Sequence, residues 1–225
     1  MKLNENFQKN VTLHSNSLEW ISSPMRGVER KMLERIGDEV VDRATSIVRY
    51  AAGSRFSSHA HDGGEEFIVL EGVFQDEHGD YPAGSYLRNP PTSQHTPRSE
   101  NGCIIFVKLA QFDPKDRTSV KLDTNKMMPV HDKTREGVSV IPLFQDDREN
   151  VRIEIWEAGR EVQIDATNGA EILLLDGQFQ AVDEIFEKQS WMRLAPDQKI
   201  SAVASSTGAK VWVKSGHLRN ELSQS

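Results

Sequence analysis

The sequence contains a single cysteine, Cys103, and therefore cannot form an intrachain disulfide. This excludes the small secreted domains that depend on several disulfides in place of a large core. No run of about 18 apolar residues is present either, which argues against a membrane-spanning helix. The first ten residues, MKLNENFQKN, lack the apolar stretch of a secretion signal. We therefore expect a cytoplasmic protein with no membrane partner.

A surplus of basic charge is also missing. Lys and Arg number 27 against 34 Asp and Glu, which gives a formal net charge of −7. Because nucleic-acid phosphates attract basic surfaces, we expect no nucleic-acid partner. The 225 residues are 37% hydrophobic, which is ordinary for a globular protein and enough for one large β domain or two smaller ones. Cys103 lies in the apolar run GCIIFVKLA, where we expect an inert buried thiol.

Short strand-like runs dominate the pattern along the chain, and Gly, Pro, Asn and Asp separate many of them. Strands spaced this closely indicate an all-β fold, either a sandwich or a barrel. Residues 27–36 show a weaker pattern, and we expect this segment to be helical or irregular. The expected strands are residues 45–50, 66–70, 104–109, 151–156, 171–175 and 210–214.

The chain also repeats itself with a period of about 106 residues. SIVRYAAGSRFSSHAHDGGEEFIVLEGVF resembles RIEIWEAGREVQIDATNGAEILLLDGQF, and the run IIFVK later in the first copy resembles KVWVK in the second. This alignment pairs Gly53 with Gly159 and Arg88 with Arg193, with one deletion near Gly177. A period of this length indicates a duplicated domain rather than a solenoid. We expect two domains, residues 1–115 and 116–225, with a polar linker within residues 112–135.

Potential metal ligands gather in the first copy. His59 and His61 are two residues apart, so on a strand both imidazoles point to the same face. Gly63 and Gly64 form a natural turn, and a carboxylate follows directly. Imidazole and carboxylate together suit Zn, Fe, Mn, Ni or Co. His95 is the best candidate for a further ligand, whereas the remaining histidines, His14, His78, His131 and His217, are expected to be solvated.

The spacing G-x5-HxH-x3-E-x6-G, filled by Gly53, His59, His61, Glu65 and Gly72, resembles the first cupin motif. GDYPAGSYLRNPPTSQHTP, which contains His95, is similar to the cupin-like domain of the zinc-dependent anti-sigma factor ChrR. The resemblance implies a tandem cupin, or bicupin, made of two β-barrel (jelly-roll) repeats. It also implies a metal held by the residues His59, His61, Glu65 and His95. Zinc is the usual metal of that family, and Fe, Mn or Ni stays open.

The second copy departs from this motif. In our alignment Asp165 and Thr167 replace the two histidines of the HxH pair, Ile200 stands where His95 stands, and Glu171 aligns with Glu65. The single glutamate of the second copy favours Glu65 over Glu66 as the ligand. One carboxylate and an aspartate cannot form the same site, so we expect one divalent metal per chain and a paired or hydrogen-bonded Glu171.

The resemblance supports two functions. The first is a sensory, regulatory role in an oxidative or singlet-oxygen stress response. The helical, zinc-binding HxxxCxxC domain that binds the sigma factor has no counterpart in the sequence, so we do not expect anti-sigma activity. The second is a cupin dioxygenase that acts on a small diketone-like substrate. A small-molecule ligand in the first barrel, a protein partner and a homodimer stay open. Residues near the motifs that we expect to pack or to carry surface charge are Arg49, Tyr50, Phe67 and Arg88.

Overall fold

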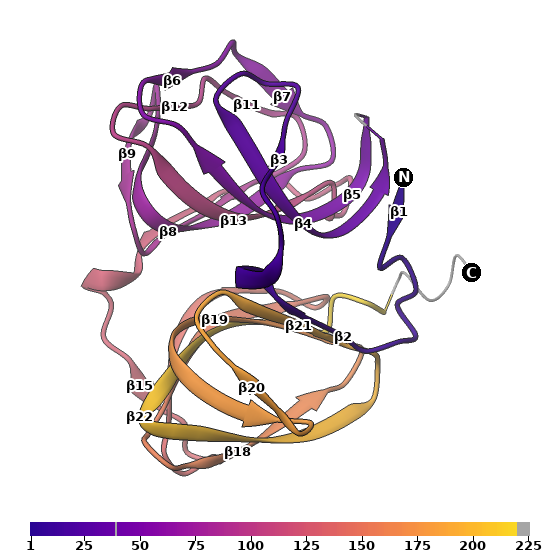
Figure 1. Ribbon diagram of the computed structural model, residues 1–225, viewed down its shortest axis with the longest axis vertical. Coiled ribbons are helices and arrows are strands. Elements are labelled where there is room, and N and C mark those ends of the chain that lie inside the picture. The colour runs from indigo at the N-terminus through magenta and orange to yellow at the C-terminus, as the bar shows by residue number, and fades with distance from the viewer. Residues whose placement is uncertain (39, 220–225) are drawn as a thin grey trace. The chain divides into compact units, whose positions relative to one another are not determined.

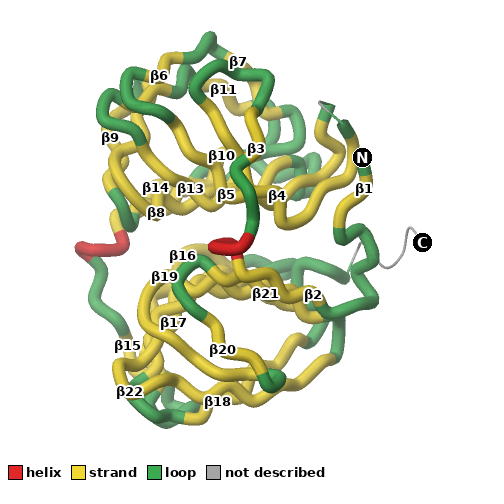
Figure 2. Tube along the Cα trace, in the orientation of Figure 1, coloured by secondary structure: helices red, strands yellow, loops and turns green. Residues whose placement is uncertain are grey.

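The computed structural model describes residues 1–38 and 40–219 and consists almost entirely of antiparallel strands (Figures 1 and 2). Within the described residues the only helical elements are two 3-10 turns, η1 (Ser15–Ser17) and η2 (Thr124–Lys126). The all-β prediction is therefore confirmed. None of the helices found there has the length or hydropathy needed to cross a membrane.

The described chain folds into two compact units, and the second takes up a strand from near the N-terminus. The first unit contains residues 1–5 and 19–126, and the second contains residues 6–18 and 127–225. β2 (Val11–His14) pairs with β21 (Ser190–Leu194) in the second unit, where Figure 1 shows it as an indigo strand. β14 (Val120–Asp123) pairs with β10 (Ser85–Asn89) in the first. The units thus differ from the two contiguous ranges 1–115 and 116–225.

In the first unit the main sheet has the strand order β1-β4-β5-β13-β8-β10-β14, and β7 and β11 form a separate ladder. The other strands of this unit are β1 (Lys2–Leu3), β3 (Ile21–Ser22), β4 (Val28–Gly37), β5 (Val41–Tyr50), β6 (Ser54–Arg55), β7 (His59–His61), β8 (Glu65–Asp76), β9 (Gly79–Pro82), β11 (Ser93–His95), β12 (Arg98–Ser99) and β13 (Cys103–Leu109).

The second unit repeats this plan with the order β15-β16-β17-β22-β19-β21-β2, and β18 pairs with β22. Its further strands are β15 (Val130–His131), β16 (Val138–Gln145), β17 (Asn150–Trp156), β18 (Glu161–Ala166), β19 (Ala170–Ala181), β20 (Glu184–Phe186) and β22 (Gln198–Ser215).

All six strands expected from the sequence are present, within β5, β8, β13, β17, β19 and β22. The expectation of a helical or irregular segment at residues 27–36 is wrong, because β4 covers residues 28–36 and pairs with β5. The charged residues of this strand interrupt the apolar pattern by which a strand is recognised in a sequence. Glu34 is buried yet accepts a hydrogen bond of 2.6 Å from Nε of Arg43 on β5, and such a tertiary partner cannot be identified from local pattern.

The interiors of the two barrels differ. In the second unit most inward-facing residues form one apolar cluster that includes Trp156, Ile164, Ala166 and Ala170. In the first unit a smaller apolar cluster around Phe67 and Val69 lies beside a cavity of about 300 Å³. One copy of the fold is therefore filled with side chains, and the other is hollow.

Candidate metal centre

The backbone register decides which of the two adjacent glutamates reaches the cavity. Glu65 lies opposite Leu109 on β13, and both residues line the cavity. Glu66 lies opposite Lys108 and therefore faces the other side of the sheet. There it is buried and accepts a hydrogen bond of 2.6 Å from the Tyr86 hydroxyl. Only Glu65 of this pair is directed toward the histidines.

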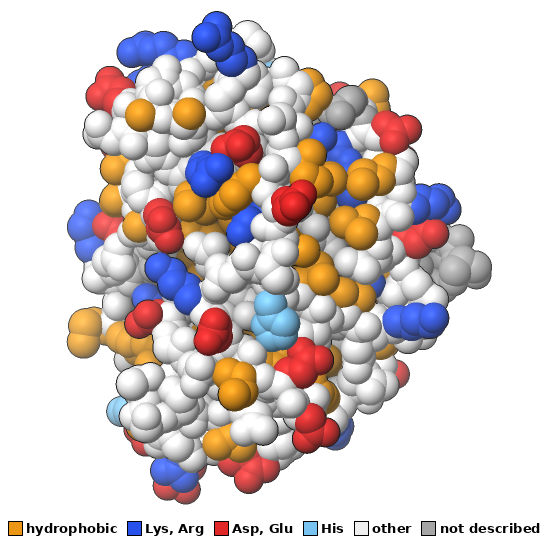
Figure 3. Space-filling view, viewed as in Figure 1, with side chains coloured by type: hydrophobic (Ala, Val, Ile, Leu, Met, Phe, Trp, Pro, Cys, Tyr) orange, Lys and Arg blue, Asp and Glu red, His pale blue; other side chains and the backbone are white. Residues whose placement is uncertain are grey.

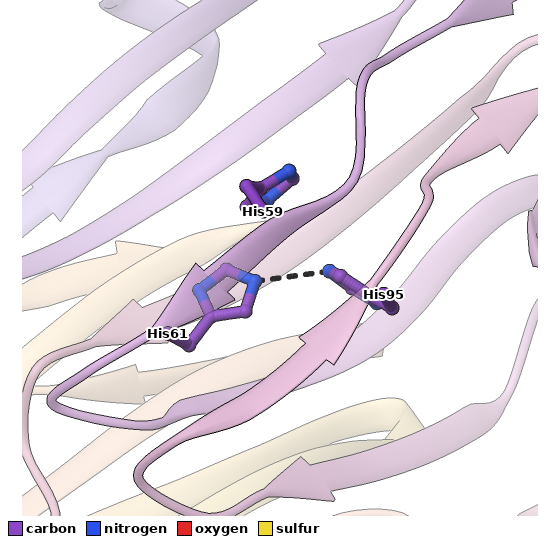
Figure 4. Close-up of side chains that lie close together, drawn as sticks. All are labelled: His59, His61 and His95. Atoms are coloured by element: carbon purple, nitrogen blue, oxygen red, sulfur yellow. Dashed lines mark hydrogen bonds between the residues drawn. The ribbon is translucent and has the colours of Figure 1, made fainter.

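The three histidines converge from the two strands of one small ladder. His59 and His61 lie on β7, and His95 lies opposite His59 on β11. Figure 4 shows the three rings directed toward one another, with Nε2 of His61 2.9 Å from Nε2 of His95. One ring nitrogen from each histidine can be chosen so that all three lie within 4.8 Å of one another. The β7–β11 ladder thus brings together residues that are 34 positions apart in sequence.

The Glu65 carboxylate completes the cluster. Its Oε2 atom lies 3.6 Å from Nε2 of both His61 and His95, and it accepts a hydrogen bond of 3.1 Å from Nδ2 of Asn89. Nitrogen ligands of one zinc ion, each about 2.1 Å from the metal, lie about 3.0 to 3.4 Å apart. The separation of the His61 and His95 nitrogens is close to this range. The three imidazoles could therefore hold a metal ion, and the Glu65 carboxylate lies beside them.

Neighbouring groups orient the ligands. Nδ1 of His59 lies 3.1 Å from the Ser57 carbonyl oxygen, and Nδ1 of His95 lies 3.6 Å from Oδ2 of Asp76. Oδ1 of Asp76 in turn accepts hydrogen bonds from the Tyr81 hydroxyl and from the backbone amides of the turn after β8. Carboxylates and carbonyls in this position fix the tautomer and the orientation of metal-binding histidines.

Electrostatics differ among these groups. Burial lowers the pKa of His61 more than the Glu65 carboxylate raises it. Burial opposes a charge on His95 as well, but the Asp76 and Glu65 carboxylates outweigh it and raise the pKa of His95. Tyr50 lines the same cavity, where burial and the Glu65 charge raise the pKa of its phenol. At neutral pH Tyr50 is therefore a hydrogen-bond donor beside the cluster.

The cavity beside the cluster lies inside the first unit and has mainly apolar walls. It is lined on the inner face of the sheet by Val28, Val48, Ile105, Val107 and Leu109, together with Phe56 of the loop before β7 and with His59, His61 and Glu65. On the face drawn in Figure 3, hydrophobic side chains of this unit reach the surface beside charged ones. Three of the candidate ligands, His59, His61 and Glu65, thus border a space large enough for a small organic molecule.

The second unit requires a correction of the sequence alignment. Glu171 lies opposite Lys214, just as Glu66 lies opposite Lys108. The deletion therefore precedes Gly169 rather than lying near Gly177, and Glu171 corresponds to Glu66, not to Glu65.

With this register, Ile164 and Ala166 occupy the places of His59 and His61, and Ala170 occupies the place of Glu65. Ile200 lies opposite Ile164 as His95 lies opposite His59. All four metal-site positions of the second unit are thus apolar, and Asp165 and Thr167 lie outside this set, exposed at the end of β18.

Glu171 is hydrogen-bonded, as expected for a buried carboxylate. It is fully buried, lies 2.7 Å from Nε2 of His217, and accepts a hydrogen bond of 3.1 Å from Nε1 of Trp191. The expectation that His217 is solvated is therefore wrong.

Other residues singled out in the sequence have structural partners. Arg49 pairs with Glu29 at 2.5 Å, and the buried Arg88 pairs with Asp116 at 2.7 Å. Cys103 is buried, as expected, and burial raises the pKa of its thiol to about 11. The sequence reasoning missed Arg30 and Arg35, which line the cavity. Recognising β4 as a strand would have been necessary to identify these arginines as facing the cavity.

Exchanging each glutamate for glutamine tests the assignment of Glu65. We expect Glu65→Gln to weaken metal binding about tenfold, because it removes an anionic ligand but keeps an oxygen donor. Glu66→Gln should leave affinity within about twofold, since Glu66 faces away from the cavity. Competition with a chelator of known affinity measures both. If Glu66→Gln releases the metal and Glu65→Gln does not, the assignment is reversed.

Comparison with known proteins agrees with this architecture. Residues 8–113 match the family described as the ChrR cupin-like domain. A search of curated protein sequences gives no match. Three similar solved structures are a "putative dioxygenase" from Nostoc punctiforme, the Escherichia coli protein Ylba, and the E. coli pirin YhhW in complex with nickel(II).

The Nostoc protein has a TM-score of 0.77 at 14% identity, and the alignment covers 94% of this chain and 84% of that protein. Ylba has a TM-score of 0.71 at 13% identity, with 94% and 93% covered. The pirin has a TM-score of 0.66 at 13% identity, with 92% and 98% covered. Identities this low show the fold alone. The chain therefore has a tandem cupin fold, and its residues 8–113 match the ChrR cupin-like domain family.

Proposed function

We propose that the first unit binds one divalent metal through His59, His61, His95 and Glu65, and that it acts on a small organic ligand held in the adjoining cavity. The observation that carries this proposal is the position of the ligands. His59, His61 and Glu65 line the same cavity of about 300 Å³. A purely structural metal has no need of such a space. Four protein ligands would leave two positions open on an octahedral iron, manganese or nickel ion.

The second unit supports the proposal as a control within the chain. Its four corresponding positions are apolar, and Ile164, Ala166 and Ala170 belong to a filled core. The fold therefore requires neither the ligands nor the cavity for its own stability. Their presence in the first unit is then explained by binding.

When bound, the metal would supply a Lewis acid that binds and polarises an oxygen of the ligand, or redox chemistry if it is iron or manganese. The protein residues have separate tasks. Asp76 orients the imidazole of His95, the apolar walls exclude water, and Tyr50 offers a neutral hydroxyl as a hydrogen-bond donor. A dioxygenase acting on a small diketone-like compound is the enzyme class that this arrangement suits.

The family match favours a second candidate function, a metal-bearing sensory domain of the ChrR type. Zinc bound by four protein ligands has a filled tetrahedral shell. Such a centre would respond to a ligand or an oxidant without turnover.

Native metal content combined with oxygen consumption separates the two functions. The protein is purified without added metal, and the identity and amount of its bound metal are determined by elemental mass spectrometry. Oxygen uptake is then measured for samples loaded with iron, manganese, nickel or zinc in the presence of small diketones. We expect about one ion per chain and uptake with a redox-active metal. Tight zinc without uptake would favour the sensory function, and no bound metal would contradict both.

A further inference from the structure

We infer that Ser46 and Tyr50 on β5 bind the ligand of this cavity by donating hydrogen bonds from their hydroxyl groups, and that the ligand is a small uncharged carbonyl compound with an apolar body. This inference rests on the proposed function, because it names the ligand class and two binding residues of the same cavity. It follows from two hydroxyl groups that the fold leaves without an acceptor.

The two hydroxyl groups belong to one row of side chains on β5. Residues two apart on a strand face the same side of a sheet, and Ser46, Val48 and Tyr50 all line the cavity. Across the ladder, Ser46 lies opposite Val107 and Val48 lies opposite Ile105, and these partners line the cavity as well. The row therefore places a hydroxyl-bearing residue two positions to either side of Val48.

Neither hydroxyl group serves the fold as a hydrogen-bond partner. Within the part of the chain that the structure describes, no residue forms a hydrogen bond with the side chain of Ser46 or of Tyr50. Ser46 is nevertheless buried. A hydroxyl group that is taken out of water without a partner costs free energy, and nearly all buried polar groups have one. A ligand that brings an acceptor into the cavity removes this cost.

Two aromatic rings hold the Tyr50 phenol in place. Its ring centroid lies 5.3 Å from that of Phe56 and 5.8 Å from that of Phe74, both in edge-to-face geometry. Phe74 in turn packs against the His95 ring, at 5.9 Å. Burial and the Glu65 charge raise the pKa of the Tyr50 phenol, which is therefore protonated at neutral pH. Tyr50 is thus a well-positioned donor in the cavity beside the candidate metal centre.

The corresponding row of the second unit lies on β17, which pairs with β22 as β5 pairs with β13. Ser46 lies opposite the residue before Lys108, and Arg152 lies opposite the residue before Lys214. Because these two lysines correspond to each other, Arg152 occupies the place of Ser46. The resulting pairs along the two strands are Ser46 and Arg152, Val48 and Glu154, and Tyr50 and Trp156.

In the second unit the members of this row bind one another. Glu154 is buried and accepts hydrogen bonds of 2.7 Å from Nε of Arg152 and 2.8 Å from Nε1 of Trp156. The side chains of arginine and tryptophan can only donate, so Glu154 is the acceptor between two donors. In the first unit Val48 stands in its place and accepts nothing. The acceptor that is missing there is the one that a ligand oxygen would supply.

Neutral hydroxyl groups and apolar walls favour an uncharged acceptor. The buried charge of Glu154 is balanced by the guanidinium groups of Arg135 and Arg152, as a buried carboxylate requires. The two hydroxyl groups of the first unit offer no such charge. Arg35 also lines the cavity, but it donates a hydrogen bond to the Asp38 carbonyl oxygen. The oxygen of a ketone, ester or amide would meet the hydroxyl groups without burying a new charge, and the volume of about 300 Å³ keeps the ligand small.

Matched pairs of small aryl ketones and their methylene analogues test this inference. The two members of a pair share a skeleton of about eight to ten carbons, sized to this cavity, and differ only in the carbonyl oxygen. Each is titrated calorimetrically into metal-loaded and metal-free protein. We expect at least one ketone to bind at least about threefold more tightly than its analogue in both forms, and Tyr50→Phe and Ser46→Ala each to weaken that ketone about three- to tenfold, as loss of one neutral hydrogen bond does. Neither variant should change the affinity of the analogue.

Tyr86→Phe is the matched control. The Tyr86 hydroxyl donates a hydrogen bond of 2.6 Å to Glu66, which faces away from the cavity, so this variant should bind the ketone as the wild type does but melt at a lower temperature. Tyr50→Phe should not lower the melting temperature of the ligand-free protein, because its hydroxyl group has no partner to lose. A less stable Tyr50→Phe protein with unchanged ketone affinity would show that this hydroxyl group serves the fold, and would overturn the inference.

The metal content of each sample separates this inference from the proposed function. Ketone binding that requires the metal and is insensitive to Tyr50→Phe would overturn the inference and leave the proposed function intact. Ketone binding that depends on Tyr50 in a protein that takes up no metal would contradict the proposed function instead. The inference is also overturned if no ketone binds or if the methylene analogues bind as well as the ketones. Unchanged ketone binding by Ser46→Ala alone would overturn the assignment of Ser46.

Discussion

Replacing His95 by alanine should reduce the metal content of the purified protein from about one ion per chain to a small fraction. Loss of a group that merely orients a metal ligand weakens binding by about 10- to 100-fold. Loss of a ligand should cost at least the upper end of that range, about 3 kcal/mol. His95 is buried, and its Nε2 lies 2.9 Å from that of His61, so no water can replace it without rearrangement. Elemental analysis and chelator competition measure the effect.

The same measurements on further variants show whether the three histidines bind one shared ion. His59→Ala and His61→Ala should each remove most of the metal, and a double variant should lose little more, because all act through one ion. Each should also lower the melting temperature of the metal-loaded protein toward that of the metal-free form. Far-UV circular dichroism should stay nearly unchanged, since the second unit folds with apolar residues at these positions.

His131→Ala is the matched control for these variants. His131 is exposed in the second unit, where its Nδ1 lies 3.1 Å from Oγ of Ser139. Its loss should therefore leave metal content unchanged. Full metal retention by His95→Ala would show that His95 is not a ligand, and the four-residue site would then have to be withdrawn.

The part of this site that could be predicted is the part set by local spacing. The period of two along a strand places His59 and His61 on one face whatever the rest of the fold does. The turn at Gly63 and Gly64 brings Glu65 back beside them. The position of His95 depends on the pairing of β11 with β7. The sequence indicates this pairing only through the resemblance to the ChrR domain.

The part that could not be predicted depends on partners distant in sequence. The alignment misplaced one deletion, and a shift of one residue turns every side chain of a strand to the other face. The sequence alignment therefore pairs Asp165 and Thr167 with His59 and His61, whereas the structure has Ile164 and Ala166 at these positions. The inward turn of Arg35 depends on a local irregularity in β4, and the pairing of β2 with β21 joins residues more than 170 positions apart. Neither leaves a recognisable local pattern.

Replacing Glu154 by alanine should destabilise the second unit by about 3–5 kcal/mol, the usual cost of removing one member of a buried ion pair. Glu154 is 1% exposed and accepts hydrogen bonds from Arg135, Arg152 and Nε1 of Trp156. Its removal would leave two guanidinium groups facing each other inside the barrel, together with a cavity. Three of the four tryptophans belong to this unit, so denaturant unfolding followed by tryptophan fluorescence reports on it directly.

The loss should depend on pH in a defined direction. Burial alone would raise the pKa of Glu154, but Arg152 and Arg135 outweigh it and lower the pKa below its ordinary value of 4.5. A carboxylate with a lowered pKa contributes its full stability above the unfolded value and loses it as the pH falls through the folded one. The difference between wild type and Glu154→Ala should therefore be constant near neutral pH and shrink below pH 4.5.

Glu157→Ala is the matched control for Glu154→Ala. Glu157 is exposed and lies 3.9 Å from Arg160, so its loss should change stability by less than about 0.5 kcal/mol. Metal content should stay at about one ion per chain in both variants, because the ligands all belong to the first unit. A loss below about 1 kcal/mol for Glu154→Ala would show that the two arginines find other partners.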